Sequence, residues 1–340
     1  MGKFFAFGPV ILTRVFGLLL KGPLIAMTEL MFRQQRILSL LSGKLQIKRA
    51  ITKNKGIKGY CYKGKTGLKK GEVKVKKYNL VAQGRTADIF EWEENRVLKL
   101  YKDGFARKTA EKEFNVVREL AKKELPVPEV FELITYQKRW GVIFEKVTGP
   151  TMLEQIASNP GDIIGEARRL AELHKNFQIK VDIQLLQFKA LVKKSISRVK
   201  EINGKTREKL WETLDQLTEG DKLCHGDFHP ENVIIGKDKV IVIDWLTAAV
   251  GNPLADVART SIILKLGAIP HHKSEEEIRV MKKLRDNFYK EYLKHYLKIT
   301  GEDQNLIEKW EIPLAAARLE ERLPLKEKRA LLSFVEKCLV

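Results

Sequence analysis

The chain has 340 residues, 44% of them hydrophobic, which is enough to bury the cores of two lobes. Its three cysteines are odd in number and widely spaced, which argues against a disulfide framework or a thiolate zinc site and favours a reducing compartment such as the cytoplasm. The formal net charge of +20 suggests, on its own, an anionic partner such as nucleic acid or a membrane surface.

Most of this positive charge lies at the start of the chain. Residues 1–78 contain 18 Lys or Arg and two Glu, a net charge of +16, which leaves +4 for the rest. The apolar stretch 4–27 is interrupted by Arg14 and Lys21, so it does not predict a transmembrane helix. We therefore expect residues 1–74 to be a poorly ordered basic leader and linker. Its charge permits weak contact with an anionic membrane, whereas its few aromatic residues argue against specific nucleic-acid binding.

The next segment, residues 75–147, has the pattern of a small antiparallel sheet with one helix. Short runs of β-forming residues predict strands at 78–83, 87–92, 96–101, 130–136 and 141–147. Residues 105–123 have helical spacing of apolar side chains, and two prolines follow them. We expect these elements to form an N-terminal lobe.

Residues 148–340 are mainly helical in pattern. Apolar periodicity predicts helices at 162–177, 184–202, 206–217 and 274–298, with two further helical segments at the C-terminus. Two short strands, 233–235 and 240–243, interrupt this region and are joined by a Gly-Lys-Asp turn. The predicted fold class is therefore α+β, with a small sheet lobe followed by a larger helical lobe.

The strongest motif is residues 225–232, which read H-G-D-F-H-P-E-N and are followed by I-D-W at 243–245. Phosphoryl transfer from ATP needs a carboxylate that orients the attacking hydroxyl and oxygen ligands that hold magnesium against the phosphates. Asp227, Asn232 and Asp244 supply that set. Each of them alone has a common structural explanation, such as a helix cap or a strand end, but their combination favours catalysis.

These residues resemble the aminoglycoside phosphotransferase and choline kinase superfamily, a branch of the protein-kinase-like fold. The resemblance covers residues 78–340 and implies an ATP- and Mg²⁺-dependent phosphotransferase that acts on a hydroxyl group of a small molecule. It implies that Asp227 is the catalytic base, that Asn232 and Asp244 bind Mg²⁺, and that His225 braces the loop. His174 and Asp256 match positions that are structural in the family, and we assign no chemistry to His229.

A kinase also needs a cation on the phosphates and a carboxylate that holds this cation in place. Lys99 lies on a predicted strand whose neighbouring residues point to the opposite face. Glu113 on the following helix is its best candidate partner, with Glu111 or Glu119 as alternatives if the register differs. We expect Lys99 and Glu113 to belong to the nucleotide site.

Two backbone segments complete the predicted nucleotide site. The loop at 83–88 lies between two strands and contains a single glycine, Gly84, so we expect its N–H groups and the Thr86 hydroxyl to contact phosphate. By the resemblance, residues 144–149 match the hinge, where backbone groups of Glu145 and Val147 bind the adenine edge.

The acceptor is expected to bind between the catalytic loop and residues 260–325. Acidic residues in that region alternate with Lys and Arg, so the dense acidic lining suited to an aminoglycoside is not indicated. Trp245 and Trp310 are candidates for lining the acceptor pocket, although large aromatic side chains more often belong to a core. The alternatives are a protein Ser/Thr kinase, disfavoured by the short interval between Asp244 and Gly251, and a nucleotide-binding pseudo-kinase or scaffold, disfavoured by the retained Lys99 and acidic residues.

Overall fold

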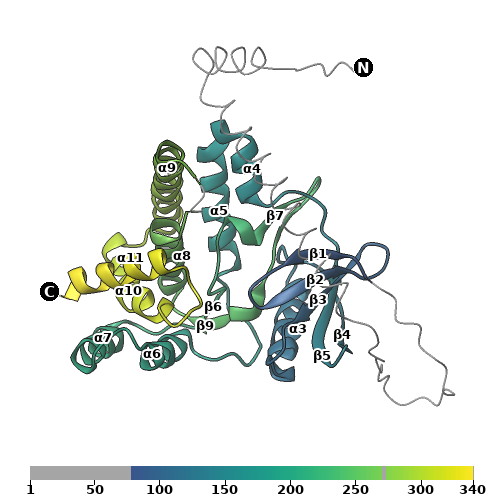
Figure 1. Cartoon of the computed structure of the whole chain (residues 1–340), viewed down its shortest axis with the longest axis horizontal. Helices are drawn as coiled ribbons and strands as arrows, with labels where there is room; N and C mark the ends of the chain where they lie inside the picture. Colours follow the sequence, from purple (N-terminus) through teal and green to yellow (C-terminus); the bar gives the residue numbers. More distant parts are fainter. Residues whose placement is uncertain (1–77, 270–272, 340) are drawn as a thin grey trace, which may run out of the picture.

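The computed structural model describes residues 78–269 and 273–339. The predicted leader, 1–74, and its expected membrane contact lie outside the described residues. Figure 1 shows the strands β1 to β5 and helix α3 gathered in one lobe, and the remaining helices gathered in another. The predicted two-lobed α+β architecture is confirmed. Within the described residues, no helix is long and apolar enough to cross a membrane.

The N-terminal lobe is built on a five-stranded antiparallel sheet with strand order β1-β2-β3-β5-β4. Its strands are β1 (Leu80–Gln83), β2 (Ala87–Glu91), β3 (Arg96–Tyr101), β4 (Val130–Tyr136) and β5 (Arg139–Glu145). The bounds of β3 and β4 agree with the prediction, but β5 begins and ends two residues earlier than predicted. Its start is set by a two-residue turn, Gln137 and Lys138, in which both residues have positive φ, the geometry that matches the twist of a hairpin.

Helix α3 (Arg107–Lys122) packs on one face of this sheet through Val116, Val117 and Leu120. Side chains alternate along β3, so Leu98 and Leu100 pack with a separate apolar cluster while Lys99 and Tyr101 face α3. Because of this alternation, the Lys99 side chain extends from the sheet toward α3.

The C-terminal lobe is helical. Its helices are α4 (Met152–Ser158), α5 (Ile163–Phe177), α6 (Phe188–Arg198), α7 (Gly204–Gln216), α8 (Pro253–Leu266), α9 (Glu275–Thr300), α10 (Gln304–Arg318) and α11 (Leu325–Leu339), with a 3₁₀ turn η1 (Pro160–Asp162). Helix α5 packs on α9, and α8 packs on α10. The sequence patterns did not predict α4 or α8 as helices, although each begins at a recognisable cap, Thr151 with Glu154 in α4 and Asn252 with Pro253 in α8.

Two short two-stranded sheets lie between the lobes in Figure 1. Strand β6 (Lys222–Cys224) pairs with β9 (Ala249–Gly251), and β7 (Val233–Ile235) pairs with β8 (Val240–Val242). The 3₁₀ turns η2 (Pro230–Asn232) and η3 (Trp245–Thr247) complete the two connections. This pairing sets the segment 225–232 beside the segment 243–248. Trp245 and Trp310 are both buried in the core, so the interpretation of these two as acceptor-pocket residues is wrong.

Candidate active site

The loop 225–232 is held in one conformation by its first two residues. Gly226 has φ of 78°, and a Cβ there would lie 2.9 Å from the carbonyl oxygen of Thr247, so only glycine fits. His225 Nε2 lies 3.0 Å from the carbonyl oxygen of Ile243, and its Nδ1 accepts from the Asp227 N–H at 3.3 Å. Burial lowers the pKa of His225, which favours the neutral ring that this pair of contacts requires. The ring thus ties the loop to the end of β8.

A buried carboxylate fixes the start of the same loop. Asp256 of α8 accepts hydrogen bonds from the backbone N–H groups of His225 and Gly226, at 2.7 and 2.8 Å. Its Oδ2 also lies 3.1 Å from Nε2 of His174, whose other ring nitrogen contacts the hydroxyl of Tyr292 at 2.6 Å. These contacts make Asp256 an anchor of the loop and leave it no exposed surface for a substrate.

Asp227 projects from this loop next to a buried arginine. Arg259 of α8 donates from Nε to the Gly226 carbonyl oxygen at 3.1 Å, and its Nη2 lies 3.4 Å from Asp227 Oδ1. Burial by itself raises the pKa of Asp227, but His229 and the Arg259 charge lower it well below the ordinary range. The carboxylate is therefore ionised at neutral pH, which suits it to accept a hydrogen bond from a hydroxyl.

Asn232 lies at the other end of the loop. Its Nδ2 donates to the carbonyl oxygen of Asp227 at 2.8 Å, a hydrogen bond within the loop. The side-chain oxygen Oδ1 therefore points away from that bond. His229 Nε2 lies 3.3 Å from the same Nδ2 and 3.7 Å from Asp227 Oδ2. Asn232 and Asp227 are thus positioned by one another.

Asp244 follows β8 in the left-handed conformation, with φ of 65°, a region that aspartate adopts more readily than most residues. Its side chain remains 38% exposed and its Oδ1 accepts from Lys99 Nζ at 2.8 Å. Lys99 Nζ also donates to Glu113 Oε1 at 2.8 Å, and the hydroxyl of Tyr101 donates to the other oxygen of Glu113. The structure therefore brings Lys99, Glu113 and Asp244 into one contiguous group.

The geometry also chooses among the three glutamates of α3. Glu113 is buried against Lys99, whereas Glu111 pairs with Arg107 and Glu119 with Lys122. Burial lowers the pKa of Lys99, but the charges of Glu113 and Asp244 outweigh burial and raise it, so the ammonium stays protonated. A fixed cation stands between the two lobes.

The loop expected to cover phosphate connects β1 to β2. The Gly84 N–H donates to the Ala87 carbonyl oxygen at 2.9 Å, and the Thr86 carbonyl oxygen accepts from the Lys102 N–H at 2.9 Å. These bonds close a tight loop whose tip residue, Arg85, is exposed. The Gly84 N–H is engaged within the loop, which leaves the Thr86 side chain as the better candidate of the two predicted residues.

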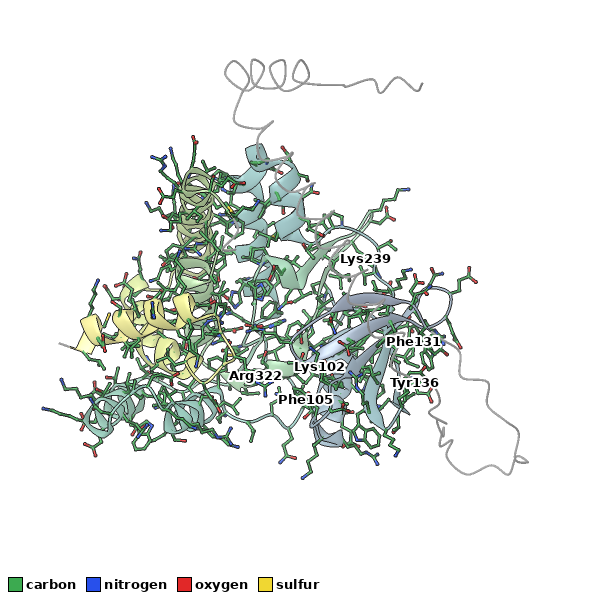
Figure 2. All side chains as sticks on the ribbon, in the orientation of Figure 1. Lys102, Phe105, Phe131, Tyr136, Lys239 and Arg322 are labelled. Carbon is green, nitrogen blue, oxygen red and sulfur yellow. The ribbon has the colours of Figure 1, made fainter. Side chains whose placement is uncertain are left out.

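The predicted hinge follows β5. The Glu145 N–H donates to Glu129 and the Lys146 N–H donates to Asn95, at 2.9 and 2.8 Å. Among the backbone hydrogen bonds of residues 78–269 and 273–339, none involves Val147, so its N–H is available to an adenine edge. The Glu145 carboxylate joins the lobes from the hinge, because its Oε1 lies 2.6 Å from Nζ of Lys239, labelled in Figure 2.

The sequence patterns missed Arg259 as a partner of Asp227 and missed its second partner, Glu321. Arg259 Nη2 lies 2.5 Å from Glu321 Oε1, on the connection between α10 and α11. Arg259 follows Asp256, a residue named in the sequence analysis, by three positions. Residues three apart on a helix lie on the same side of it, so the position of Asp256 could have indicated that Arg259 also faces the loop.

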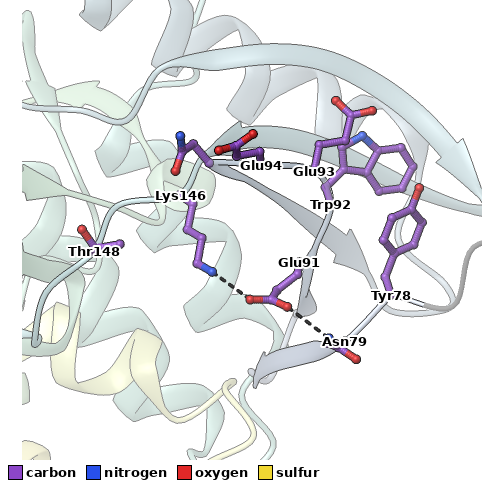
Figure 3. Close-up of a pocket in the computed structure, with 9 residues that line it drawn as sticks. Tyr78, Asn79, Glu91, Trp92, Glu93, Glu94, Lys146 and Thr148 are labelled. Atoms are coloured by element: carbon purple, nitrogen blue, oxygen red, sulfur yellow. Dashed lines mark hydrogen bonds and ion pairs between the residues drawn. The ribbon is translucent and has the colours of Figure 1, made fainter.

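A separate hollow of about 540 Å³ lies between the turn that joins β2 to β3 and the hinge segment, where Lys146 and Thr148 flank Val147. Figure 3 shows its lining, in which Lys146 contacts Glu91 at 2.8 Å and Trp92 stacks on Tyr78. None of the predicted catalytic or metal-binding residues lines it. This hollow is therefore distinct from the group formed by Lys99, Glu113 and Asp244 and from Asp227.

Known proteins resemble this chain in sequence pattern and in fold. Residues 78–304 match the model of a family described as phosphotransferase enzyme family. Similar solved structures include the amicoumacin kinase hAmiN in complex with AMP-PNP, Ca²⁺ and Ami, with 15% identity over 78% of this chain and 89% of that chain and a TM-score of 0.54. They also include a thermostable mutant of aminoglycoside phosphotransferase APH(4)-Ia in its apo form, with 14% identity, 77% and 91% coverage and a TM-score of 0.52.

A third similar structure is a choline/ethanolamine kinase family protein from Mesorhizobium loti, with 14% identity, 78% and 87% coverage and a TM-score of 0.51. No curated protein matches the sequence. At these identities the structural likeness shows the fold, which is kinase-like.

Proposed function

The chain belongs to the phosphotransferase enzyme family, and we propose that it transfers the γ-phosphate of ATP to a hydroxyl group of a small molecule. The observation that carries the proposal is the meeting of Lys99 and Glu113 from the N-terminal lobe with Asp244 from the C-terminal lobe. These are the cation, its carboxylate support and the metal-binding carboxylate that kinase chemistry requires.

In this proposal the N-terminal lobe binds the nucleotide. Lys99, held by Glu113, contacts the phosphates, and the loop with Gly84 and Thr86 covers them. Backbone groups of Glu145 and Val147 bind the adenine edge. These assignments rest on the resemblance and are supported by the positions described above.

The donor set at Asn232 and Asp244 suits magnesium. Mg²⁺ prefers hard oxygen ligands and is commonly held by one or two protein groups together with substrate phosphates and water. Asn232 Oδ1 and the partly exposed Asp244 carboxylate provide such ligands, and among the described residues no cluster of three or more His, Cys, Asp and Glu that could hold a metal is present. When bound, the ion neutralises charge on the phosphates.

Asp227 accepts the hydrogen bond of the acceptor hydroxyl and orients its oxygen toward the γ-phosphorus. As the new oxygen–phosphorus bond forms, the bond from the γ-phosphorus to the bridging oxygen breaks, ADP leaves with that oxygen, and the hydroxyl proton passes to Asp227. Because Arg259 and His229 hold the carboxylate ionised, its main contribution is orientation, with proton transfer late in the step.

Two further observations support a small-molecule acceptor. Related structures hold small molecules together with nucleotides, as in an APH(4)-Ia mutant in ternary complex with AMP-PNP and hygromycin B. In this chain, η3 and β9 fill the short interval between Asp244 and α8, which leaves little room for the activation loop of a protein kinase. We place the reaction in the cytoplasm, where ATP is available and thiols such as the free Cys224 stay reduced.

The test is ADP formation by the full chain with Mg²⁺ and ATP against a panel of sugars, amino alcohols, hydroxy acids and aminoglycosides. Acceptor-dependent ADP formation that Asp227→Ala removes would support the proposal. Absence of both nucleotide binding and ADP formation would contradict it and favour the scaffold alternative.

A further inference from the structure

Three arginines converge on the carboxylate of Glu321. They come from three separate elements: Arg85 from the loop between β1 and β2, Arg259 from α8 and Arg318 from the last turn of α10. Arg259 Nη2 lies 2.5 Å from Oε1, while Arg318 Nη1 and Arg85 Nη1 lie 3.5 and 3.8 Å from Oε2. One carboxylate thus collects guanidinium groups from both lobes.

This carboxylate stands directly beside the proposed base. Arg259 Nη2 contacts both Asp227 Oδ1 and Glu321 Oε1, so the two acids are separated by a single nitrogen atom. Glu321 lies on the connection between α10 and α11, outside either helix, and its side chain is 28% exposed. The ion pair of Glu321 with Arg85 brings this connection next to the N-terminal lobe, and Figure 2 labels the residue that follows Glu321, Arg322.

One of the three arginines has an unused donor. Arg318 is 5% exposed, and its Nε and Nη2 both donate to Glu327 Oε1, at 3.2 and 2.6 Å. Within the described part of the chain, its Nη1 has no hydrogen-bond partner, because Glu321 Oε2 is too distant or poorly aligned. A buried donor without an acceptor is unfavourable, so an oxygen placed closer to this nitrogen would be stabilised.

The charges of this cluster are balanced while the Glu321 carboxylate is in place, with three arginines against three acidic side chains. The ion pair with Asp227 balances the charge of Arg259, and the ion pair with Glu327 balances the charge of Arg318. The Glu321 carboxylate then balances the third positive charge, that of Arg85. If Glu321 withdrew, a positive charge would remain at the side of Asp227. Guanidinium groups match the geometry of carboxylates and phosphates, which can accept two parallel hydrogen bonds.

We propose that the acceptor alcohol carries an anionic group, a carboxylate or a phosphate, which replaces the Glu321 carboxylate between Arg85, Arg259 and Arg318 while the hydroxyl contacts Asp227. This inference rests on the proposed phosphotransferase function and specifies its substrate class. Glu321 then acts as an internal counter-ion that occupies the anion position in the free enzyme and leaves it when the acceptor binds. A polycationic acceptor would be repelled by the same arginines.

Matched pairs of alcohols test the proposal with the full chain at constant ionic strength. Glycerol is compared with glycerate and with glycerol 3-phosphate, and ethanolamine with serine, so that each pair differs by the anionic group. We expect kcat/KM to be about 10- to 100-fold higher for the anionic member, the range typical of charge-assisted hydrogen bonds. The glycerate and phosphate arms distinguish the two anions. Equal use of both members of every pair overturns the proposal.

Malonate is a probe that requires no turnover. We expect it to raise the melting temperature of the full chain in a saturable way, with tighter binding in Glu321→Gln, which lacks the competing charge, and about tenfold weaker binding in Arg85→Ala. Lys326→Ala removes an exposed cation nearby on α11 and should leave malonate binding unchanged. No saturable effect, or an equal effect in all variants, overturns the anion site. Nucleotide binding measured in the same samples separates this result from failure of the proposed function.

Discussion

Lys99 of the N-terminal lobe and Asp244 of the C-terminal lobe lie 145 residues apart in sequence and are in direct contact, with 2.8 Å between Nζ and Oδ1. Lys112 of α3 adds a second link, because its ammonium donates to the Leu246 carbonyl oxygen at 2.9 Å. The relative position of the two lobes is therefore set at the proposed site itself, and substitutions there affect both stability and activity.

We predict that Lys99→Ala destabilises the fold by about 3–5 kcal/mol, because it leaves the carboxylate of Glu113, which is 1% exposed, without its cation. The same change should raise KM for ATP and lower kcat. Urea unfolding and steady-state kinetics measure the two effects. Lys108→Ala removes an exposed lysine from α3, the helix that carries Glu113, and should shift the free energy of unfolding by less than about 0.5 kcal/mol. Wild-type kinetics in Lys99→Ala would exclude Lys99 from the nucleotide site.

Asp227→Ala should lower kcat by about 10²- to 10⁴-fold, the usual contribution of a positioned base, while the affinity for Mg-ATP stays nearly unchanged. The reason is that the carboxylate acts on the acceptor hydroxyl and makes no contact with the nucleotide. Turnover and equilibrium binding of AMP-PNP separate these effects. Glu231→Ala, on the same loop with an exposed side chain, is the matched control. Turnover within twofold of wild type would remove Asp227 from this role.

Asp244→Ala should weaken productive Mg-ATP binding more strongly than Asn232→Ala, since only the first change removes an anionic ligand. The concentration of Mg²⁺ that gives half-maximal ADP formation should rise in both variants. A Mg²⁺ titration at saturating ATP measures this value. If both variants keep the wild-type Mg²⁺ dependence, the metal is held elsewhere.

The stability of the fold should fall at acid pH in part through Asp256. Burial alone raises its pKa, but the hydrogen bond from His174 and the backbone N–H of Gly226 hold it below the ordinary value. The unfolded chain therefore binds a proton first, so this contribution is complete above the unfolded pKa of about 4 and is lost as pH falls through the lower folded pKa.

Asp256→Asn should consequently be less stable than wild type by about 3–5 kcal/mol at pH 7, with a difference that shrinks below about pH 4. Urea unfolding from pH 7 to pH 3 follows the two proteins. Asp238→Asn, on the exposed turn between β7 and β8, should behave as wild type throughout. A difference between Asp256→Asn and wild type that stays constant with pH would contradict this account.

A shortened chain that begins at Gly71 should fold and keep the ATP turnover of the full chain, because every proposed site residue lies beyond residue 78. It should lose any salt-sensitive binding to anionic liposomes, since the removed residues 1–70 carry +14 of the net charge and each basic residue near such a surface adds about 1 kcal/mol. Liposome sedimentation at low and high salt compares the two proteins. An insoluble or inactive shortened chain would show that the predicted domain boundary is misplaced.

Short-range patterns in the sequence determined the fold class and the candidate site. Alternation along residues 96–101 placed Lys99 opposite Leu98 and Leu100, and the sequence offered Glu113 as its best candidate partner, although only the structure excluded the alternatives. The Asp227 and Asn232 spacing is likewise local, because both stand on one loop. The periodicity of apolar residues is sufficient for these assignments, because it indicates the face of a strand or helix on which a side chain lies.

Only the tertiary structure decided which residues meet across elements. Glu321 stands in a stretch of alternating acidic and basic residues that is typical of a solvated surface, yet it contacts Arg259, 62 residues earlier, and Arg85 of the other lobe. Trp245 and Trp310 suggested an acceptor pocket but are buried in the core. Their positions depend on how whole helices pack, and packing is set by the sum of many weak contacts between distant segments, which no local spacing encodes.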